Sequence, residues 1–374
     1  MTGGHRTAAH CIPERVRADL AAAHGGTMAL YVMDLDGGCL RLLAGDEARV
    51  PGEIPTRIGV GPEIPPESYD ALAAALRGAV PGCGWAPLAL ADRALGAVVR
   101  VEGGAPGLDV AAADAALALE IAGGYTDVAH AARRHTHPQA AAEMQQNLLP
   151  PRIARVNGGR LAAGVLPGYE VAGDFIDHAD NPDGVWLAVA DAVGKETLAG
   201  ALAAVAIGAL RASRRSGEGL EEAVRAMSDA VASCGQGRPA FVTAVVALWE
   251  PATGRLRWMT AGHPRPLVLR AGGEVETLEG GVSRPLGLED DPGRPAEDRL
   301  GPGDRLLLYS DGLVEQPDGR TGEPFGLDAL HEALRASARA TCAQLVRTLQ
   351  DTVLDASRER LRDDVSLLAL DVDR

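Results

Sequence analysis

The stretch Val185-Trp-Leu-Ala-Val-Ala-Asp-Ala-Val-Gly194 decides the fold, because a run of six apolar residues leads directly into an acid. An apolar run of this length, bounded by a polar residue and glycine, is typical of a buried β-strand. The strand predicted over Val185 to Ala190 therefore carries Asp191 at its end. This arrangement returns elsewhere in the chain.

Other acids also stand at the ends of predicted strands: Asp174 and Asp177 in Val171-Ala-Gly-Asp-Phe-Ile-Asp177, Asp311 after Leu306 to Tyr309, and Asp363 and Asp364 before Val365 to Leu370. One such acid is more often a turn or cap residue than a ligand. Several together would repel one another unless a cation offset their charge. Carboxylates without intervening lysine, histidine or cysteine suit Mg²⁺ or Mn²⁺, and two such ions can hold a water and a phosphoryl group for in-line displacement.

Between these acids the chain alternates predicted strands and helices. Further strands are predicted at Phe241 to Trp249, Leu256 to Thr260 and Leu267 to Arg270, and helices at Thr197 to Arg214, Leu220 to Ala232, Leu327 to Ala336 and Cys342 to Arg358. The apolar stretch Leu198 to Leu210 is predicted to be a buried helix that packs on the sheet behind Asp191.

Seven motifs carry a family resemblance: Glu170-Val-Ala-Gly-Asp-Phe-Ile-Asp177, Val189-Ala-Asp-Ala-Val-Gly-Lys-Glu196, Phe241-Val-Thr243, Ala261-Gly-His263, Pro285-Leu-Gly-Leu288, Tyr309-Ser-Asp-Gly-Leu-Val-Glu315 and Asp363-Asp-Val-Ser-Leu367. In their order and spacing, from about Leu148 to Asp371, the chain resembles the metal-dependent serine/threonine phosphatases of type 2C, in the bacterial SpoIIE-type branch. The resemblance implies an α+β fold, a four-layer α-β-β-α sandwich in which two antiparallel sheets pack face to face between helices.

The resemblance also implies a set of site residues. Asp191 would bridge two Mn²⁺ or Mg²⁺ ions, with the backbone carbonyl of Ala192 as a further ligand; Asp174 would hold the second ion, and Asp311 and Asp363 would complete the first. A metal-bridged water then attacks the phosphorus of phosphoserine or phosphothreonine, so that no protein nucleophile is needed. The implied substrate is a phosphorylated regulator of the anti-anti-sigma-factor type.

Two residues near these motifs have two interpretations each, and two others depart from the family pattern. His263 is either a general acid or a residue that holds its loop, and Lys195, the only lysine of the chain, either contacts phosphate or is a solvated turn residue. Val193 and Glu196 stand where the family often has serine and glycine, and Glu196 is expected to slow hydrolysis by repelling phosphate. These two residues leave open a second function, a catalytically weak or inactive sensor or scaffold of the same fold that binds a partner or ligand.

The N-terminal third has the pattern of a separate small α/β domain. Strands are predicted at Met28 to Leu35, Cys39 to Leu43, Trp85 to Leu90 and Leu95 to Val101, the last two as an antiparallel pair, and the proline-rich segment Pro51 to Pro66 is predicted to be an irregular loop. This part resembles the GAF-type sensor domains, with a PAS-type unit as the alternative. We therefore expect a GAF-like sensor domain at residues 1–108, a helical linker at 109–150 and the phosphatase domain at 151–374.

Apolar spacing predicts one long helix over Asp109 to Arg134, and Pro138 separates it from a second helix over Gln139 to Leu149. In the first helix, Leu117, Ile121 and Val128 form a stripe that suits the seam of a paired helix, and the alternative is that the stripe packs on its own domain. The segment from Met144 to Pro150 resembles the switch helix of this phosphatase branch, which implies regulation through a linker-mediated homodimer.

Charge and composition narrow the classes of partner and compartment. With 36 basic and 51 acidic residues the net charge is −15, which argues against nucleic acid or an anionic membrane as the main partner. The five cysteines form no Cys-x-x-Cys pair, and no apolar run has the length of a signal peptide or a membrane span. We expect a soluble protein in the reducing environment of the cytoplasm.

Overall fold

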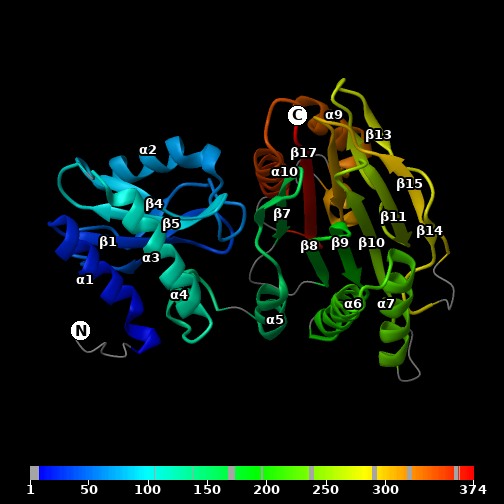
Figure 1. Cartoon of the computed structure of the whole chain (residues 1–374), viewed down its shortest axis with the longest axis horizontal. Helices are drawn as coiled ribbons and strands as arrows, with labels where there is room; N and C mark the ends of the chain where they lie inside the picture. Colours follow the sequence, from blue (N-terminus) through cyan, green and yellow to red (C-terminus); the bar gives the residue numbers. More distant parts are fainter. Residues whose placement is uncertain are drawn as a thin grey trace. The chain divides into compact units, whose positions relative to one another are not determined.

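The computed structural model describes residues 8–104, 106–137, 139–166, 173–194, 197–235, 240–288, 293–317, 322–357, 361 and 363–374. The chain divides into two compact units, Met1–His137 and Pro138–Arg374, called here the N-terminal and C-terminal units (Figure 1). The boundary lies inside the segment predicted to be a linker, so that its first part folds with one unit and its last part with the other. In the described part of the chain, no helix is long and apolar enough to cross a membrane.

The N-terminal unit is built on a five-stranded antiparallel sheet with the strand order β3-β2-β1-β5-β4: β1 Met28–Met33, β2 Cys39–Ala44, β3 Glu53–Pro55, β4 Gly84–Leu90 and β5 Arg93–Arg100. The four predicted strands and the antiparallel pairing of β4 with β5 are confirmed. The prediction that Pro51 to Pro66 lacks regular structure is wrong at β3, where an edge strand accommodates a proline that a central strand would not.

Helices cover both faces of this sheet: α1 Ile12–His24, α2 Tyr69–Ala79, α3 Leu108–Gly123 and α4 Val128–Ala132, with short 3₁₀ turns at Ala9–Cys11 and Pro66–Ser68. One apolar cluster lies between the sheet and α2 and includes Tyr31 and Leu72. A second cluster on α1 and α3 includes Leu20 and Leu119.

The prediction of one long helix over residues 109–134 is wrong. Helix α3 ends at Gly123, and α4 begins only at Val128. Glycine has the lowest helix propensity of any residue except proline, and two glycines stand together at Gly123 and Gly124. They interrupt the helix although the helical spacing of apolar residues continues beyond them. Leu117 and Ile121 nevertheless remain 53% and 58% exposed on α3, so these two residues do not pack on their own domain, whereas Val128 on α4 is half-buried.

The C-terminal unit contains two six-stranded sheets. Sheet 1 comprises β8 Asp174–Asn181, β9 Gly184–Ala192, β10 Val242–Glu250, β11 Arg255–Ala261, β14 Val282–Ser283 and β15 Ala296–Arg299, in the order β14-β11-β10-β9-β8 with β15 also paired to β11. Sheet 2 comprises β6 Ile153–Val156, β7 Gly159–Leu166, β12 Leu267–Leu269, β13 Val275–Thr277, β16 Arg305–Tyr309 and β17 Val365–Val372, in the order β13-β12-β16-β17-β7-β6. Apart from the short parallel pair of β11 and β14, neighbouring strands are antiparallel.

The two sheets pack face to face over a core that includes Leu187, Trp249, Leu306 and Leu368 (Figure 1). The outer face of sheet 1 is covered by α6 Thr197–Arg215 and α7 Leu220–Cys234, and sheet 2 is covered by α9 Gly326–Ala336 and α10 Cys342–Ser357. Two shorter helices, α5 Ala140–Leu148 and α8 Asp311–Glu315, lie near the ends of strands. The predicted four-layer sandwich and the buried helix behind Asp191 are thus confirmed.

Candidate metal centre

The register of sheet 1 brings three polar residues into one row. Asp174, the first residue of β8, pairs with Asp191 near the end of β9, and Asp191 pairs in turn with Thr243 on β10. The strand preceding Asp191 is buried on both faces, which fixes the register that places the two acids opposite each other.

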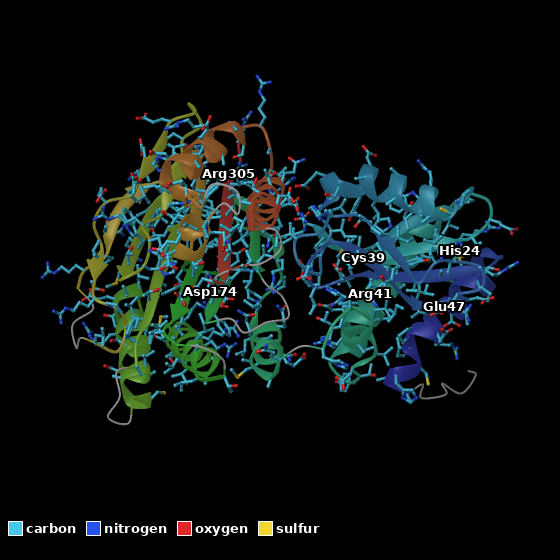
Figure 2. All side chains as sticks on the ribbon, turned by 180° about the vertical axis from the view of Figure 1, so that it is seen from behind. His24, Cys39, Arg41, Glu47, Asp174 and Arg305 are labelled. Carbon is cyan, nitrogen blue, oxygen red and sulfur yellow. The ribbon has the colours of Figure 1, made fainter. Side chains whose placement is uncertain are left out.

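Sheet 2 supplies the other acids at the same end of the sandwich. Asp311 follows β16 as the first residue of α8, and Asp363 and Asp364 immediately precede β17. Tyr309 pairs with Leu367, so these strand ends are neighbours. In Figure 2, Arg305 and Asp174 lie toward opposite ends of β17, the red strand, and the candidate acids belong to the end marked by Asp174.

Two glycines allow the backbone to close around this end. A Cβ on Gly173 would lie 2.7 Å from the carbonyl oxygen of Ala192 and 3.2 Å from a carboxylate oxygen of Asp191. A Cβ on Gly312 would lie 1.9 Å from the carbonyl oxygen of Asp364. Both distances are too short for any side chain, so these glycines are required by the close packing of the acidic loops.

Asp174 is the most enclosed of the acids. It is 2% exposed, and among the residues that the structure describes none forms a hydrogen bond with its Oδ2. Burial first, and then the charges of Asp191 and Asp364, raise the pKa of Asp174 well above its usual range, while the hydroxyls of Ser310 and Ser366 act in the opposite direction. A buried carboxylate with an unpartnered oxygen is costly unless another group satisfies it.

The other acids show the same mutual repulsion. Burial, together with the charges of Asp311 and Asp363, raises the pKa of Asp191 to about 7. Burial and the charge of Asp363 also raise the pKa of Asp311. Asp364 accepts a hydrogen bond from the Gly173 amide at 2.8 Å, yet burial raises its pKa to about 8. The two sheets therefore bring together carboxylates that a cation would stabilise.

The donor set fits a hard cation, because it consists of carboxylate oxygens with one orphaned oxygen among them. Asp174 pairs with Asp191 across β8 and β9, and the charge of Asp363 raises the pKa of Asp311. Within the ranges that the structure describes, however, no three His, Cys, Asp or Glu side chains are grouped closely enough to hold a metal ion. Metal binding by Asp174, Asp191, Asp311, Asp363 and the Ala192 carbonyl is therefore taken up below as a proposal.

The raised pKa values predict how stability depends on pH when metal is removed with EDTA. Folded Asp191 and Asp364 keep their protons up to about pH 7 and about pH 8, whereas the unfolded chain releases them near pH 4. The folded state binds more protons across this window, so the free energy of unfolding should fall as pH rises from about 4 to about 8.

Calorimetry in EDTA should show a falling Tm between about pH 5 and 8, and Asp364→Asn should flatten the slope. Excess Mn²⁺ should also flatten the slope of Tm against pH, because the bound cation stabilises the carboxylates in their ionised form. A Tm that rises with pH across this window would contradict the arrangement of acids.

Asp177 lies on β8 but does not belong to the acidic cluster. Its carboxylate, 1% exposed as a residue, accepts hydrogen bonds from Arg211 at 2.7 Å and from Arg214 at 3.0 Å, both on α6. Arg211 also donates to the backbone carbonyl of Leu148 at 2.6 Å. Asp177 thus joins sheet 1, α6 and the end of α5 through a buried ion-pair network.

Gln145 is a residue that the sequence pattern did not single out. It is fully buried on α5, and its Nε2 donates a 2.6 Å hydrogen bond to the backbone carbonyl of Asp174. A signal was present, because Gln145 follows Ala141 by four residues and so lies on the same buried helix face. Helix α5 therefore contacts the backbone of the most enclosed candidate ligand.

His263 is buried, and its two alternatives can be weighed from its contacts. The ring Nδ1 lies 2.8 Å from Thr243 Oγ1, and that hydroxyl reaches the backbone carbonyl of Asp191 at 3.4 Å. Burial lowers the pKa of His263 to about 3, despite a hydrogen bond with the backbone of Tyr309. A ring that stays neutral near pH 7 is poorly suited to donate a proton, so the geometry favours the loop-holding role. Lys195 and Glu196 lie outside the described residues.

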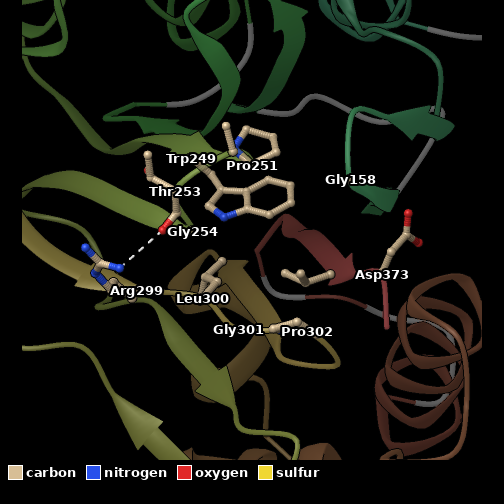
Figure 3. A pocket seen from close by; sticks show the side chains of 12 residues that line it. Gly158, Trp249, Pro251, Thr253, Gly254, Arg299, Leu300, Gly301, Pro302 and Asp373 are labelled. Atoms are coloured by element: carbon tan, nitrogen blue, oxygen red, sulfur yellow. Dashed lines mark hydrogen bonds between the residues drawn. The ribbon is translucent and has the colours of Figure 1, made fainter.

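A surface cavity of about 470 Å³ lies at the other end of the sandwich (Figure 3). Its lining comes from the turns after β6, β10 and β15 and from the end of β17, and includes Trp249, Pro251, Arg299 and Asp373. Arg299 contacts the carbonyl of Thr253 at 3.5 Å there. None of the candidate acids lines this cavity, which is therefore not the candidate metal centre.

Comparison with known families decides the identity. A family model described as Stage II sporulation protein E (SpoIIE) matches residues 181–373, which is more than half of the 374-residue chain. The chain belongs to the SpoIIE family. The SpoIIE match covers β9, β16 and β17, the strands that carry or adjoin Asp191, Asp311 and Asp363.

Individual relatives agree with membership in the SpoIIE family. The chain is 22% identical over 236 residues to the phosphoserine phosphatase RsbU of Bacillus subtilis (strain 168), covering 62% of this chain and 69% of RsbU. The SiaA-PP2C domain of Pseudomonas aeruginosa matches with a TM-score of 0.50 and 22% identity, over 56% of this chain and 86% of that domain. The C-terminal unit of this SpoIIE-family chain has the same fold as that PP2C domain.

Proposed function

We propose that this chain hydrolyses phosphoserine or phosphothreonine in a phosphorylated regulatory protein, with two Mn²⁺ or Mg²⁺ ions as cofactors. The observation that carries the proposal is the meeting of acids from both sheets at one end of the sandwich. Asp174 and Asp191 come from sheet 1, and Asp311 and Asp363 from sheet 2. Their mutual repulsion and the orphaned oxygen of Asp174 are the features of a centre that binds cations.

Asp174, Asp191, Asp311, Asp363 and the Ala192 carbonyl would hold the two ions. When bound, such cations supply a water nucleophile at neutral pH and neutralise charge on the phosphoryl oxygens. The protein's own part is to hold the carboxylates in place. Thr243 and the neutral ring of His263 support the backbone at Asp191, and the carboxyl of Asp364 holds the Gly173 amide next to Asp174.

The proposed substrate class is a phosphorylated partner-switching protein of the anti-anti-sigma-factor type. The support comes from the SpoIIE family membership and from the relative named phosphoserine phosphatase RsbU. With a net charge of −15, this chain is suited neither to nucleic acid nor to an anionic membrane.

Release of inorganic phosphate from a phosphoserine peptide, measured with and without Mn²⁺, tests this function. We expect turnover that depends on Mn²⁺ or Mg²⁺ and disappears in EDTA. Tight Mn²⁺ binding without any release of phosphate would favour the second function, an inactive sensor or scaffold of the same fold.

We also propose that residues 1–108 form a GAF-like sensor domain and that residues 109–150 link it to the phosphatase domain in the cytoplasm. Two contacts support regulation through the second half of this linker: Gln145 binds the Asp174 carbonyl, and Arg211 binds the Leu148 carbonyl. A change in the position of α5 would therefore reach the candidate metal centre directly.

The exposed stripe of α3 predicts a homodimer. Leu117 and Ile121 lie one helical turn apart and face solvent, while the opposite face of α3 is buried against its own sheet. Leu117→Glu combined with Ile121→Glu should convert a dimer into a monomer with altered basal activity, as measured by sedimentation at tens of micromolar. Asp114→Glu on the same helix serves as the control. A monomeric unmodified protein would end the dimer proposal and leave the phosphatase function untouched.

A further inference from the structure

Three large apolar side chains are exposed on segments that adjoin the strands of sheet 1 near the candidate metal centre. Val193, Leu198 and Leu288 are 37%, 65% and 44% exposed. In the part of the C-terminal unit that the structure describes, only Val282 and Leu327 are other large apolar side chains with such exposure. Exposed apolar groups that gather beside a functional site are typical of a surface that binds a partner.

Backbone contacts place Val193 and Leu288 at the same end of sheet 1 as the acids. The amide of Val193 donates to the carbonyl of Phe241 at 3.2 Å. The next residue, Val242, exchanges hydrogen bonds of 3.1 and 2.8 Å with Leu286. Val193 therefore adjoins the start of β10 on the side of β9, and Leu286, two residues before Leu288, adjoins it on the opposite side.

The same residues adjoin the candidate ligands. Val193 follows Asp191 by two residues, and Val242 pairs directly with Ala192. Leu198 lies in the first turn of α6, the helix that packs behind the strand of Asp191. Two residues of extended chain span about 7 Å, so a polypeptide whose phosphate reaches Asp191 also reaches Val193 with its neighbouring residues.

We propose that Val193, Leu198 and Leu288 form an apolar docking surface for the phosphoprotein substrate, which contacts them through apolar residues on either side of its phosphorylated residue. This inference rests on the proposed phosphatase function. A permanently bound partner at this position would block the approach to the acids, whereas a substrate covers the surface only during turnover. Apolar contacts also suit a phosphate dianion that must approach an acidic site, because their strength does not depend on charge.

Three probes test the surface in the full chain with Mn²⁺: p-nitrophenyl phosphate, a phosphoserine heptapeptide flanked by leucine and valine, and the same peptide flanked by serine and glycine. We expect the KM for the apolar peptide to be about tenfold below that for the polar peptide, since burial of one or two aliphatic side chains has this effect. Leu198→Ser and Leu288→Ser should each reduce the ratio of the KM for the polar peptide to the KM for the apolar peptide to about two or less. Hydrolysis of p-nitrophenyl phosphate should stay unchanged, and Leu288→Met should keep the preference.

Fluorescence anisotropy of the labelled peptides gives a second readout that needs no turnover. Tighter binding of the apolar peptide that is lost in both serine variants supports the docking surface. Equal KM and equal binding for the two peptides, or a preference that survives in both serine variants, would overturn it while leaving the phosphatase function intact. Absence of hydrolysis with all three probes would instead contradict the proposed function, and the anisotropy comparison would still decide the docking surface.

Discussion

Asp191→Asn is expected to abolish phosphate release, with a loss of at least about a thousandfold in kcat, while the protein remains folded. Asp191 pairs with Asp174 in sheet 1, and its pKa is raised by the charges of Asp311 and Asp363 from sheet 2. It therefore interacts with acids from both sheets of the proposed metal centre. Loss of one ligand charge from a metal centre of this kind removes several kcal/mol of transition-state stabilisation, and each 1.4 kcal/mol is about a factor of ten in rate.

The control for Asp191→Asn is Asp180→Asn, at the other end of β8, where the carboxylate accepts a surface hydrogen bond from the Asn157 amide. Asp180→Asn should leave kcat within about twofold. In EDTA, Asp191→Asn should melt at the same temperature as the unmodified protein or higher, because one repelling charge is gone. Activity within twofold of the unmodified protein at saturating Mn²⁺ would refute the assignment of Asp191 as a metal ligand.

The second large effect concerns stability: Asp177→Ala should destabilise the C-terminal unit by about 3 kcal/mol. The substitution leaves the guanidinium groups of Arg211 and Arg214 without their shared carboxylate, and the side chain of Arg214 is only 8% exposed. Removal of one partner from a buried ion pair typically costs about 3–5 kcal/mol. For a domain of this size the Tm should fall by roughly 6–12 °C.

Asp373→Ala is the matched control, because Asp373 pairs with Arg155 while both side chains remain well exposed. Its cost should stay within about 1 kcal/mol, as for other surface ion pairs. Differential scanning calorimetry of the two variants in the same buffer separates the cases. If Asp177→Ala lowers the Tm no more than Asp373→Ala, the Asp177 network does not stabilise the fold.

Strands were predicted correctly where a long apolar run was present, and a helix was predicted correctly where prolines marked its two ends. The run ending at Asp191 and the strands Arg305 to Tyr309 and Val365 to Val372 are confirmed, as is a helix between Pro138 and Pro150. Helices α1 and α2 were missed, because their apolar residues are few and widely mixed with alanine. Strand β7 was missed because small alanines and Gly164 interrupt its apolar run.

The acids of the site were predicted from their positions at strand ends, but their surroundings were not. The partners of Asp177 lie 34 and 37 residues away, and Gly173 and Asp364 are separated by 191 residues. No local period encodes such distances, because they depend on how the two sheets pack. The break after Gly123 shows the opposite case, in which two local glycines override an apolar period that continues to Val128.

The contact between Gln145 and the Asp174 carbonyl bears on where the phosphatase domain can be cut from the chain. A fragment that begins at residue 151, the boundary expected from the sequence, would lose α5. It would then lack Gln145, which donates to the Asp174 carbonyl, and the Leu148 carbonyl, which accepts a hydrogen bond from Arg211. Such a fragment would retain every candidate ligand but expose buried polar groups beside the most enclosed one. Its metal affinity and rate would then be those of a domain deprived of part of its own scaffold, whereas a fragment that starts ahead of Ala140 keeps both contacts.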